Sequence, residues 1–218
     1  MVKVALLPAK PLPLAKTRLG SLLDDRDRMA MAGAMFADVL HALSDAAGLD
    51  AVVVITADAT LAARGRSAGA VVVDEGTPRG LNGAVALGTE FALRLGATSV
   101  LVVLSDVPLV LPTDVDELLA RAPDYGALLV PSKEGTGTNA MLRQPPTIFP
   151  PCFGGRSLER HVAAAERGRL VCEIVRSARI GFDLDTPEDL RAFAAHESAT
   201  ETYREVLRLG TSTLRPSA

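Results

Sequence analysis

The stretch that decides the fold is AVVVITADATLAARGRSAGAVVVD, residues 51–74. It holds two β-branched, continuously apolar runs, Ala51–Thr56 and Ala70–Asp74, separated by a segment long enough for one helix. Apolar runs without polar alternation are typical of strands buried on both faces of a parallel sheet. Asp58 lies where the helix between them would begin and would cap it. Residues 51–74 therefore predict a right-handed β–α–β unit.

The same alternation of short strands and amphipathic segments extends along most of the chain. Further strands are expected at Val2–Leu7, Ser99–Leu104, Gly126–Pro131, Asn139–Arg143 and Leu170–Val175. Further helices are expected at Arg26–Ala47, Leu81–Leu95, Thr113–Ala122, Ser157–Arg167 and from Pro187. Such a pattern predicts an α/β fold, in which a mostly parallel sheet is flanked by helices in a single domain.

Composition and charge exclude several classes of protein. The 218 residues are 48% hydrophobic and 22% charged, which is ordinary for one globular domain. A net charge of −3 argues against general nucleic-acid binding. We expect neither a membrane span nor a signal peptide, and the two distant cysteines fit a reducing cytoplasm. The expected organisation is a domain over residues 1–197 and a C-terminal tail over 198–218.

The first loop is the strongest candidate for an anion site. Ligands of parallel sheets bind beyond the C-terminal ends of the strands, where the segment PAKPLPLAKTRLG, Pro8–Gly20, lies. It carries Lys10, Lys16 and Arg18, and its three prolines restrict its conformations. It matches neither a Walker loop nor a GxGxxG turn. A stiff, basic loop before a helix predicts either a polyphosphate site or a solvated surface loop.

Two acidic segments are candidates for binding Mg²⁺. Asp106 follows a buried strand in LVVLSDVPLV, where a carboxylate needs a cation or serves as a turn or helix cap. In GFDLDTPEDLRAF, Asp183 and Asp185 are expected on one side of an extended segment, and Asp185 is the better second ligand. Thr186 is expected to cap the following helix, and Asp189 to complement its dipole.

Three clusters of small residues follow other strands. GLNGAV, residues 80–85, predicts either close approach of backbone to a ligand or a helix entry capped by Asn82. GTGTNAML, residues 135–142, and FGGRSLERH, residues 153–161, offer hydroxyls and amides that suit an anion. A structural role is favoured for His161, and no motif of a nucleophilic triad is present.

Taken in order, these motifs resemble the guanylyltransferases of coenzyme F-420 biosynthesis, called CofC in archaea and FbiD in mycobacteria. The matching segments are LLPAKPLPLAKTRL, GLNGAV, LSDVPLV, GTGTNAML, FGGRSLERH and DLDTPEDL, between about Val2 and Phe193. Their combination is much more specific than any one of them. The resemblance implies the Rossmann-like nucleotidyltransferase fold, which is that of the nucleotide-diphospho-sugar transferases and of the molybdopterin type.

The resemblance also implies an activity: transfer of GMP from GTP to a small phosphoacid, phosphoenolpyruvate or 2-phospho-L-lactate, with release of pyrophosphate. For the nucleotide it implies Lys10, Lys16, Arg18, Gly80, Leu81 and Asn82. For the phosphate of the acceptor it implies Thr138, Gly154 and Ser157. For Mg²⁺ it implies Asp106 and Asp185, and for catalysis Lys16, Arg18 and Asp106. Pro108 stands where a second acidic residue would follow Asp106, which leaves the number of metal ions open.

Two alternatives stay open beside this hypothesis. A relative could transfer a nucleotide to a pterin or a sugar phosphate, and a nucleotide-sensing module would bind without turnover. No side chain chooses among phosphoenolpyruvate, 2-phospho-L-lactate and 3-phosphoglycerate. The expected partners are GTP and the phosphoacid, with neither nucleic acid nor membrane. A homodimer, or hand-off of the product to the next enzyme of the pathway, is compatible with the sequence.

Overall fold

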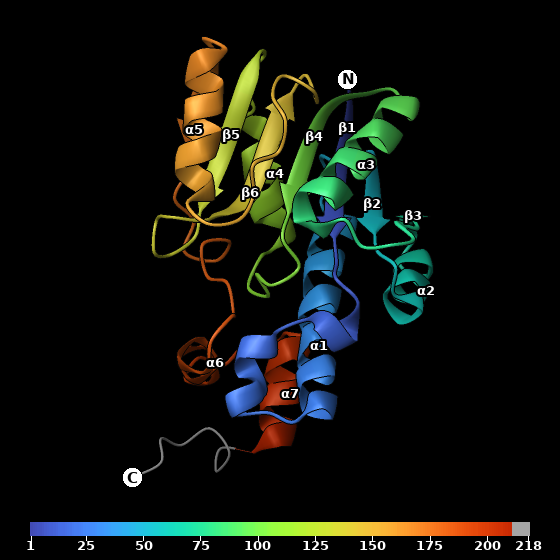
Figure 1. The fold of residues 1–218 in the computed structure, drawn as a ribbon, viewed down its shortest axis with the longest axis vertical. Coiled ribbons are helices and arrows are strands. Elements are labelled where there is room, and N and C mark those ends of the chain that lie inside the picture. Colours follow the sequence, from blue (N-terminus) through green and yellow to red (C-terminus); the bar gives the residue numbers. More distant parts are fainter. Residues whose placement is uncertain (211–218) are drawn as a thin grey trace.

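Seven strands form one sheet, described here in a computed structural model that covers residues 1–210 (Figure 1). The strands are β1 (Val2–Pro8), β2 (Ala51–Ile55), β3 (Val71–Val73), β4 (Ala97–Val103), β5 (Gly126–Pro131), β6 (Thr138–Gln144) and β7 (Val171–Ile174). Their order is β3-β2-β1-β4-β6-β5-β7. Only β6 is antiparallel to its neighbours, so the expected mostly parallel sheet is confirmed.

Helices cover both faces of the sheet. They are α1 (Asp25–Ser44), α2 (Ala59–Ser67), α3 (Gly80–Arg94), α4 (Pro112–Ala120), α5 (Ser157–Arg167), α6 (Pro187–Ala194) and α7 (Glu201–Leu209). The helices α1, α2 and α4 share one apolar core with the sheet. On the other face α3 and α5 form a second core. Successive side chains of a strand point to opposite faces of the sheet. Because each face packs into one of these two cores, the central strands are apolar throughout.

The expected local signals are found at the helix starts. The Asp58 side chain accepts hydrogen bonds from the amides of Thr60 and Leu61 and so caps α2. Thr186 caps α6, with Pro187 at the first helical position. The boundaries differ modestly, since the strand expected at Ser99–Leu104 is β4 at Ala97–Val103. Residues 181–186, in contrast, form no strand and follow a turn.

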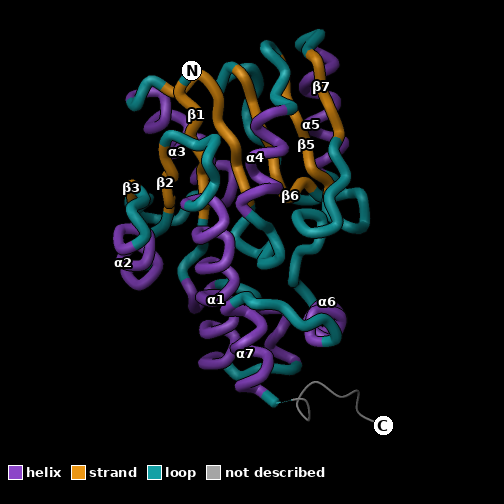
Figure 2. Tube along the Cα trace, turned by 180° about the vertical axis from the view of Figure 1, so that it is seen from behind, coloured by secondary structure: helices purple, strands orange, loops and turns teal. Residues whose placement is uncertain are grey.

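The C-terminal helix packs against the first long helix. Asp38 of α1 accepts hydrogen bonds from the amides of Glu201 and Thr202, at 2.7 and 2.9 Å, and from the Thr202 hydroxyl at 2.6 Å. Part of the expected tail is thus the helix α7, beside α1 in both views (Figure 2). Residues 211–218 of the expected tail lie outside the described residues, and the boundary at 197 stays a prediction.

A third apolar cluster joins α1, α6 and α7 to the basic loop. Its fully buried members include Leu19 of the loop and Leu184 of the segment before α6. Two distant parts of the chain are thereby fixed beside the C-terminal ends of β1 and β4. Among residues 1–210, none of the helices combines the length and hydropathy that crossing a bilayer requires.

Candidate active site

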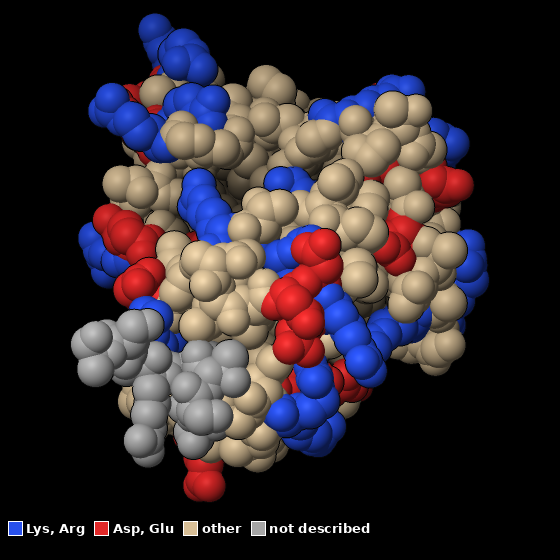
Figure 3. Space-filling model, turned by 60° about the horizontal axis from the view of Figure 1, so that its bottom comes forward, with Lys and Arg blue, Asp and Glu red and all other residues tan. Residues whose placement is uncertain are grey.

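A cavity of about 620 Å³ lies at the C-terminal ends of β1 and β4. Most of the site residues expected from the sequence line it: Lys10, Lys16, Gly80, Leu81, Asn82, Asp106, Gly154 and Asp185. Figure 3, which brings this end of the molecule forward, shows a hollow flanked by basic side chains. The volume suits a small-molecule ligand. Glu75 also lines the cavity, although no feature of the sequence singled it out.

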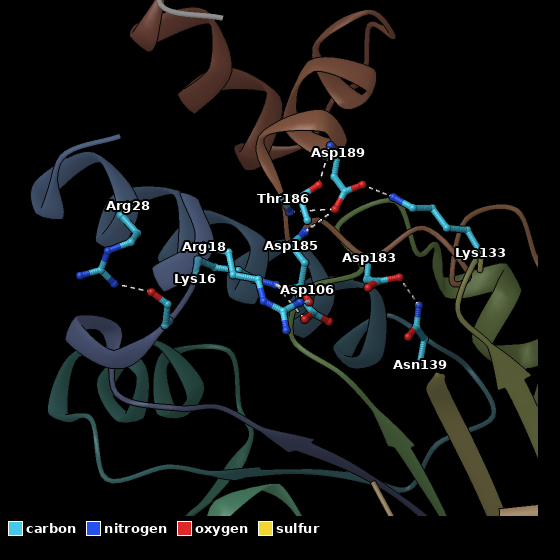
Figure 4. A network of polar contacts seen from close by, with 11 residues as sticks. Lys16, Arg18, Arg28, Asp106, Lys133, Asn139, Asp183, Asp185, Thr186 and Asp189 are labelled. Atoms are coloured by element: carbon cyan, nitrogen blue, oxygen red, sulfur yellow. Dashed lines mark hydrogen bonds and ion pairs between the residues drawn. The ribbon is translucent and has the colours of Figure 1, made fainter. Parts of the chain in front are cut away.

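Lys16, Asp106 and Asp185 form a charged cluster on the cavity wall, and Arg18, which does not line the cavity, lies exposed beside it (Figure 4). Lys16 Nζ lies 2.7 Å from Asp106 Oδ2 and 2.5 Å from Asp185 Oδ1. Arg18 Nη1 lies 3.8 Å from Asp185 Oδ2. Burial alone would lower the pKa of Lys16, but the two carboxylates outweigh it and raise that pKa. Lys16 is therefore a permanent cation held between two acids.

The basic loop is fixed in place at two points, one between its prolines and one after them. The Leu12 amide donates to Asp58 Oδ2 at 2.9 Å, so that Asp58 also anchors the loop while capping α2. Arg28, buried on α1, donates to the carbonyl of Ala15. Lys16 follows in the left-handed region, with φ of 51°. A non-glycine residue in that region costs free energy, which these neighbouring anchors offset.

One backbone contact and one side-chain amide hold the segment with the distant acids in place. The Leu184 amide donates to the carbonyl of Asp106 at 3.0 Å, which joins the segment before α6 to the turn after β4. Asn139 Nδ2 on β6 donates to the carbonyl of Ile180 at 2.9 Å and to Asp183 Oδ1 at 3.1 Å. Asp183 therefore has a different partner from Asp185. Burial, with nearby Asp106 and Asp185, raises the pKa of Asp183.

Asp185 has a further support that the sequence indicated only in part. Asp189 Oδ2 accepts from the amides of Asp185 at 3.0 Å and Thr186 at 2.8 Å, which confirms its role at the helix start. Lys133 Nζ forms an ion pair with Asp189 Oδ1. Burial raises the pKa of Asp189, but Lys133 and the amides outweigh it and lower that pKa. The sequence analysis did not single out Lys133. The available signal was the scarcity of lysine, since the chain has only four lysines beside 19 arginines.

The two acids of the charged cluster suit a hard divalent cation. Within residues 1–210, Asp106 Oδ1 is buried and has no hydrogen-bond partner. Carboxylate oxygens are the ligands that Mg²⁺ prefers. In the same part of the chain, however, no three acidic, histidine or cysteine side chains are grouped as a metal site. The donor set therefore fits a cation held by two protein carboxylates and completed by other oxygens.

The expected acceptor residues do not all face the cavity. Gly154 lines it, whereas Thr138 and Ser157 are each only 2% exposed and do not. Thr138 Oγ1 lies 3.0 Å from His161 Nδ1, while His161 Nε2 accepts from the Cys152 amide at 2.9 Å. The proton of His161 is then on Nδ1, which donates to Thr138. This is the structural role favoured for His161.

Asn82 does not cap α3, because the helix begins at Gly80 and its N-cap residue is Arg79. The capping alternative for Asn82 is therefore wrong. Its side-chain amide instead faces the loop before α5. Nδ2 donates to the carbonyl of Phe153 at 3.1 Å, and Oδ1 accepts from the amide of Phe153 at 2.7 Å. The sequence offered no signal for this pairing between residues 71 positions apart.

The fold is shared with solved nucleotidyltransferase structures. A crystal structure of a nucleotide-diphospho-sugar transferase from Desulfovibrio desulfuricans superposes with a TM-score of 0.80 at 18% identity, covering 98% of this chain and 97% of that one. A nucleotidyl transferase from Methanothermobacter gives 0.63 at 17% identity, covering 98% of each. The expected nucleotide-diphospho-sugar transferase-like fold is confirmed.

Sequence comparisons resolve the family within that fold. The family described as guanylyl transferase CofC like matches residues 3–217. A phosphoenolpyruvate guanylyltransferase from Conexibacter woesei is 40% identical, over 88% of this chain and 87% of the relative. A 2-phospho-L-lactate guanylyltransferase from Methanothermobacter thermautotrophicus is 32% identical, over 100% and 95%. A 3-phospho-D-glycerate guanylyltransferase from Phenylobacterium zucineum is 36% identical, over 80% and 82%. The chain is an enzyme that belongs to the CofC-like guanylyl transferase family.

Proposed function

We propose that this enzyme transfers GMP from GTP to the phosphate of a small phosphoacid and releases pyrophosphate. The observation that carries the proposal is the charged cluster on one side of a ligand-sized cavity, in a chain of this family. Three relatives are named for three different phosphoacids, so the acceptors to test are phosphoenolpyruvate, 2-phospho-L-lactate and 3-phosphoglycerate.

The proposed chemistry needs positioning and neutralisation of charge more than proton transfer. An oxygen of the acceptor phosphate attacks the α-phosphorus of GTP, and the bond to the β-phosphate breaks. The attacking oxygen is already anionic, so no general base is needed, but two anions must approach each other. Lys10, Lys16 and Arg18 supply positive charge around the triphosphate and the departing pyrophosphate. Gly80 and Leu81, which line the cavity, are proposed to lie beside the guanosine.

Mg²⁺ is the proposed cofactor, with Asp106 and Asp185 as its protein ligands. Support comes from the buried Asp106 Oδ1, which lacks a hydrogen-bond partner within residues 1–210. When bound, Mg²⁺ supplies Lewis-acid neutralisation of phosphate oxygens. Lys16 Nζ now contacts both carboxylates, and we expect it to exchange them for phosphate oxygens when nucleotide binds.

The acceptor is proposed to bind on the side of the cavity formed by Gly154. The backbone N–H groups of Gly154 and Gly155 precede α5 and donate to no other residue in the described chain. Free amides before a helix suit a phosphate. Thr138 and Ser157 remain the proposed further contacts, and both must rotate or be uncovered to reach the ligand. The cytoplasmic location, a homodimer and hand-off of the product stay predictions.

The test is a product assay with GTP, Mg²⁺ and each of the three phosphoacids in turn. We expect one acid to give a diphosphate-linked guanosine by mass spectrometry, together with an equal amount of pyrophosphate. Replacing GTP by CTP and adding EDTA test the base and the metal. Tight binding of GTP without pyrophosphate release from any acid would contradict the proposal and favour a nucleotide-sensing protein.

A further inference from the structure

Both polar atoms of the Asn82 side-chain amide form hydrogen bonds with one other residue that lines the cavity. Its Nδ2 donates to the carbonyl of Phe153, and its Oδ1 accepts from the amide of Phe153, at 3.1 and 2.7 Å. An amide side chain bound in this way imitates a strand neighbour. The Asn82–Phe153 pair thus joins the first turn of α3 to the loop before α5, 71 residues later.

The neighbours of Phe153 show that this loop is held at consecutive peptide groups. Arg160 Nη2 donates to the same Phe153 carbonyl at 2.9 Å. His161 accepts from the preceding amide, and its ring packs edge-on against the Phe153 ring with centroids 4.9 Å apart. The next residue, Gly154, lines the cavity with φ of 111°, a conformation open to glycine.

From these contacts we propose that Asn82 is a positioning residue for the acceptor. By fixing Phe153, it fixes the free amides of Gly154 and Gly155 that are proposed to bind the acceptor phosphate. This inference rests on the proposed function and assigns Asn82 differently from the sequence, which placed it beside the guanosine. The two bonds to Phe153 fix the orientation of the Asn82 amide, so that turning it toward a base would break both of them.

Asn82→Ala is the variant that separates the two roles. It removes both hydrogen bonds that hold Phe153 from this side, and we expect the KM for the phosphoacid to rise about tenfold. The Kd for GTP, measured by calorimetry without acceptor, should stay within about twofold. A weaker GTP complex with an unchanged KM for the acceptor would overturn the proposal and indicate that Asn82 contacts the guanosine.

Arg160→Ala provides a second variant, because Arg160 donates to the same carbonyl but leaves Asn82 in place. We expect a rise in acceptor KM of about threefold, in the same direction as for Asn82→Ala. The matched control is Thr98→Val, which removes a side-chain hydrogen bond to the Val2 carbonyl at the N-terminal ends of β4 and β1, away from the cavity. Thr98→Val should change neither constant.

Hydrogen exchange gives a readout that does not need turnover. In ligand-free protein, Asn82→Ala should speed exchange at the Phe153 amide, which loses its acceptor, and leave the amides of β4 unchanged. Unchanged exchange at Phe153 would overturn the inference while the proposed function stands. Faster exchange in a protein whose wild type converts no phosphoacid would instead contradict the proposed function, and with it the role of Asn82 in acceptor binding.

Discussion

The two sides of the cavity are held by opposite kinds of interaction. On one side the charged cluster gathers Lys16, Asp106 and Asp185 through ion pairs of 2.7 and 2.5 Å. On the other, hydrogen bonds to backbone groups hold Phe153 and its neighbours, mostly from neutral side chains and with no ion pair among them. The pKa values follow this division, because carboxylates raise that of Lys16 whereas burial lowers that of His161 to about 4.

The difference teaches how each side can respond to a ligand. Ion pairs within the charged cluster can be exchanged for phosphate or metal at small net cost, since one strong electrostatic partner replaces another. Neutral hydrogen bonds to the buried Phe153 offer no such exchange, and breaking them leaves unsatisfied groups. We therefore expect the charged cluster to rearrange during the reaction and the Asn82–Phe153 side to remain fixed.

The largest expected effect is that of Asp106→Asn on turnover. The substitution keeps the size of the side chain but removes the charge that Lys16 and the proposed Mg²⁺ require. Loss of one electrostatic contact of this kind typically costs about 10²- to 10³-fold in kcat. Steady-state assays of pyrophosphate release measure it.

The control for Asp106→Asn is Asp45→Asn, which changes an acid paired with His41 at the end of α1. Its kcat should equal that of the wild type. Thermal melting should show both variants folded. Near-normal turnover in Asp106→Asn would remove Asp106 from the mechanism and leave the charged cluster with a structural role.

The next largest effect is that of His161, beside the Asn82–Phe153 pair, on the free energy of unfolding. Burial, with nearby Arg143 and Arg160, lowers its pKa to about 4, against about 6.5 in an unfolded chain. Between pH 6.5 and 4 the unfolded chain binds a proton at His161 that the folded chain does not bind. The free energy of unfolding is therefore highest above pH 6.5 and falls as the pH decreases toward 4. The expected loss is about 3 kcal/mol.

Urea unfolding between pH 7 and 4 measures this loss. His161→Gln should flatten the dependence, whereas His41→Gln should not, because His41 is 75% exposed on α1. The difference between the two variants isolates His161 from the carboxylates that titrate in the same range. Parallel curves for all three proteins would show that His161 is not held neutral.

These two sides differed in how far the sequence could predict them. Charge is visible in sequence, so Lys16, Asp106 and Asp185 followed from their loops, and the β–α–β pattern placed them at one edge of the sheet. The Asn82–Phe153 pair could not be predicted, because a side chain bound to backbone puts no constraint on the identity of its partner. Thr138 and Ser157 were assigned to the acceptor by the resemblance, and the sequence carried no sign that both side chains are buried, on β6 and α5.

A smaller effect is expected for Lys16→Met, in which cation binding and turnover should change in opposite directions. Lys16 Nζ lies between the two proposed metal ligands, so its removal frees both carboxylates. We expect Mn²⁺, used as a probe for Mg²⁺, to bind the ligand-free variant about tenfold more tightly, the scale of one partly exposed ion pair. Turnover should fall at the same time, because a charge that faces the triphosphate is lost.

Electron paramagnetic resonance of free Mn²⁺ measures that affinity. Lys3→Met is the control, since Lys3 lies at the other end of β1 and does not line the cavity. Mn²⁺ affinity that stays the same in Lys16→Met would mean that Asp106 and Asp185 are not the metal ligands. Weaker affinity would mean the same.

The smallest expected effect is that of Asp189→Asn, which acts on the charged cluster through backbone. Asp189 holds the amide of Asp185, and Lys133 holds Asp189, so weakening either contact lets Asp185 shift. One weakened charge-assisted hydrogen bond predicts a fall in kcat of about fivefold with little change in the KM for GTP. Lys133→Met should have a similar effect, and the double variant should be no worse than either single one, because both act on the same contact. The control is Glu188→Gln. Glu188 directly precedes Asp189 but pairs with Arg191 at the surface, so this variant should leave kcat unchanged. Additive losses of kcat in the double variant would show that Lys133 and Asp189 affect the site independently of each other.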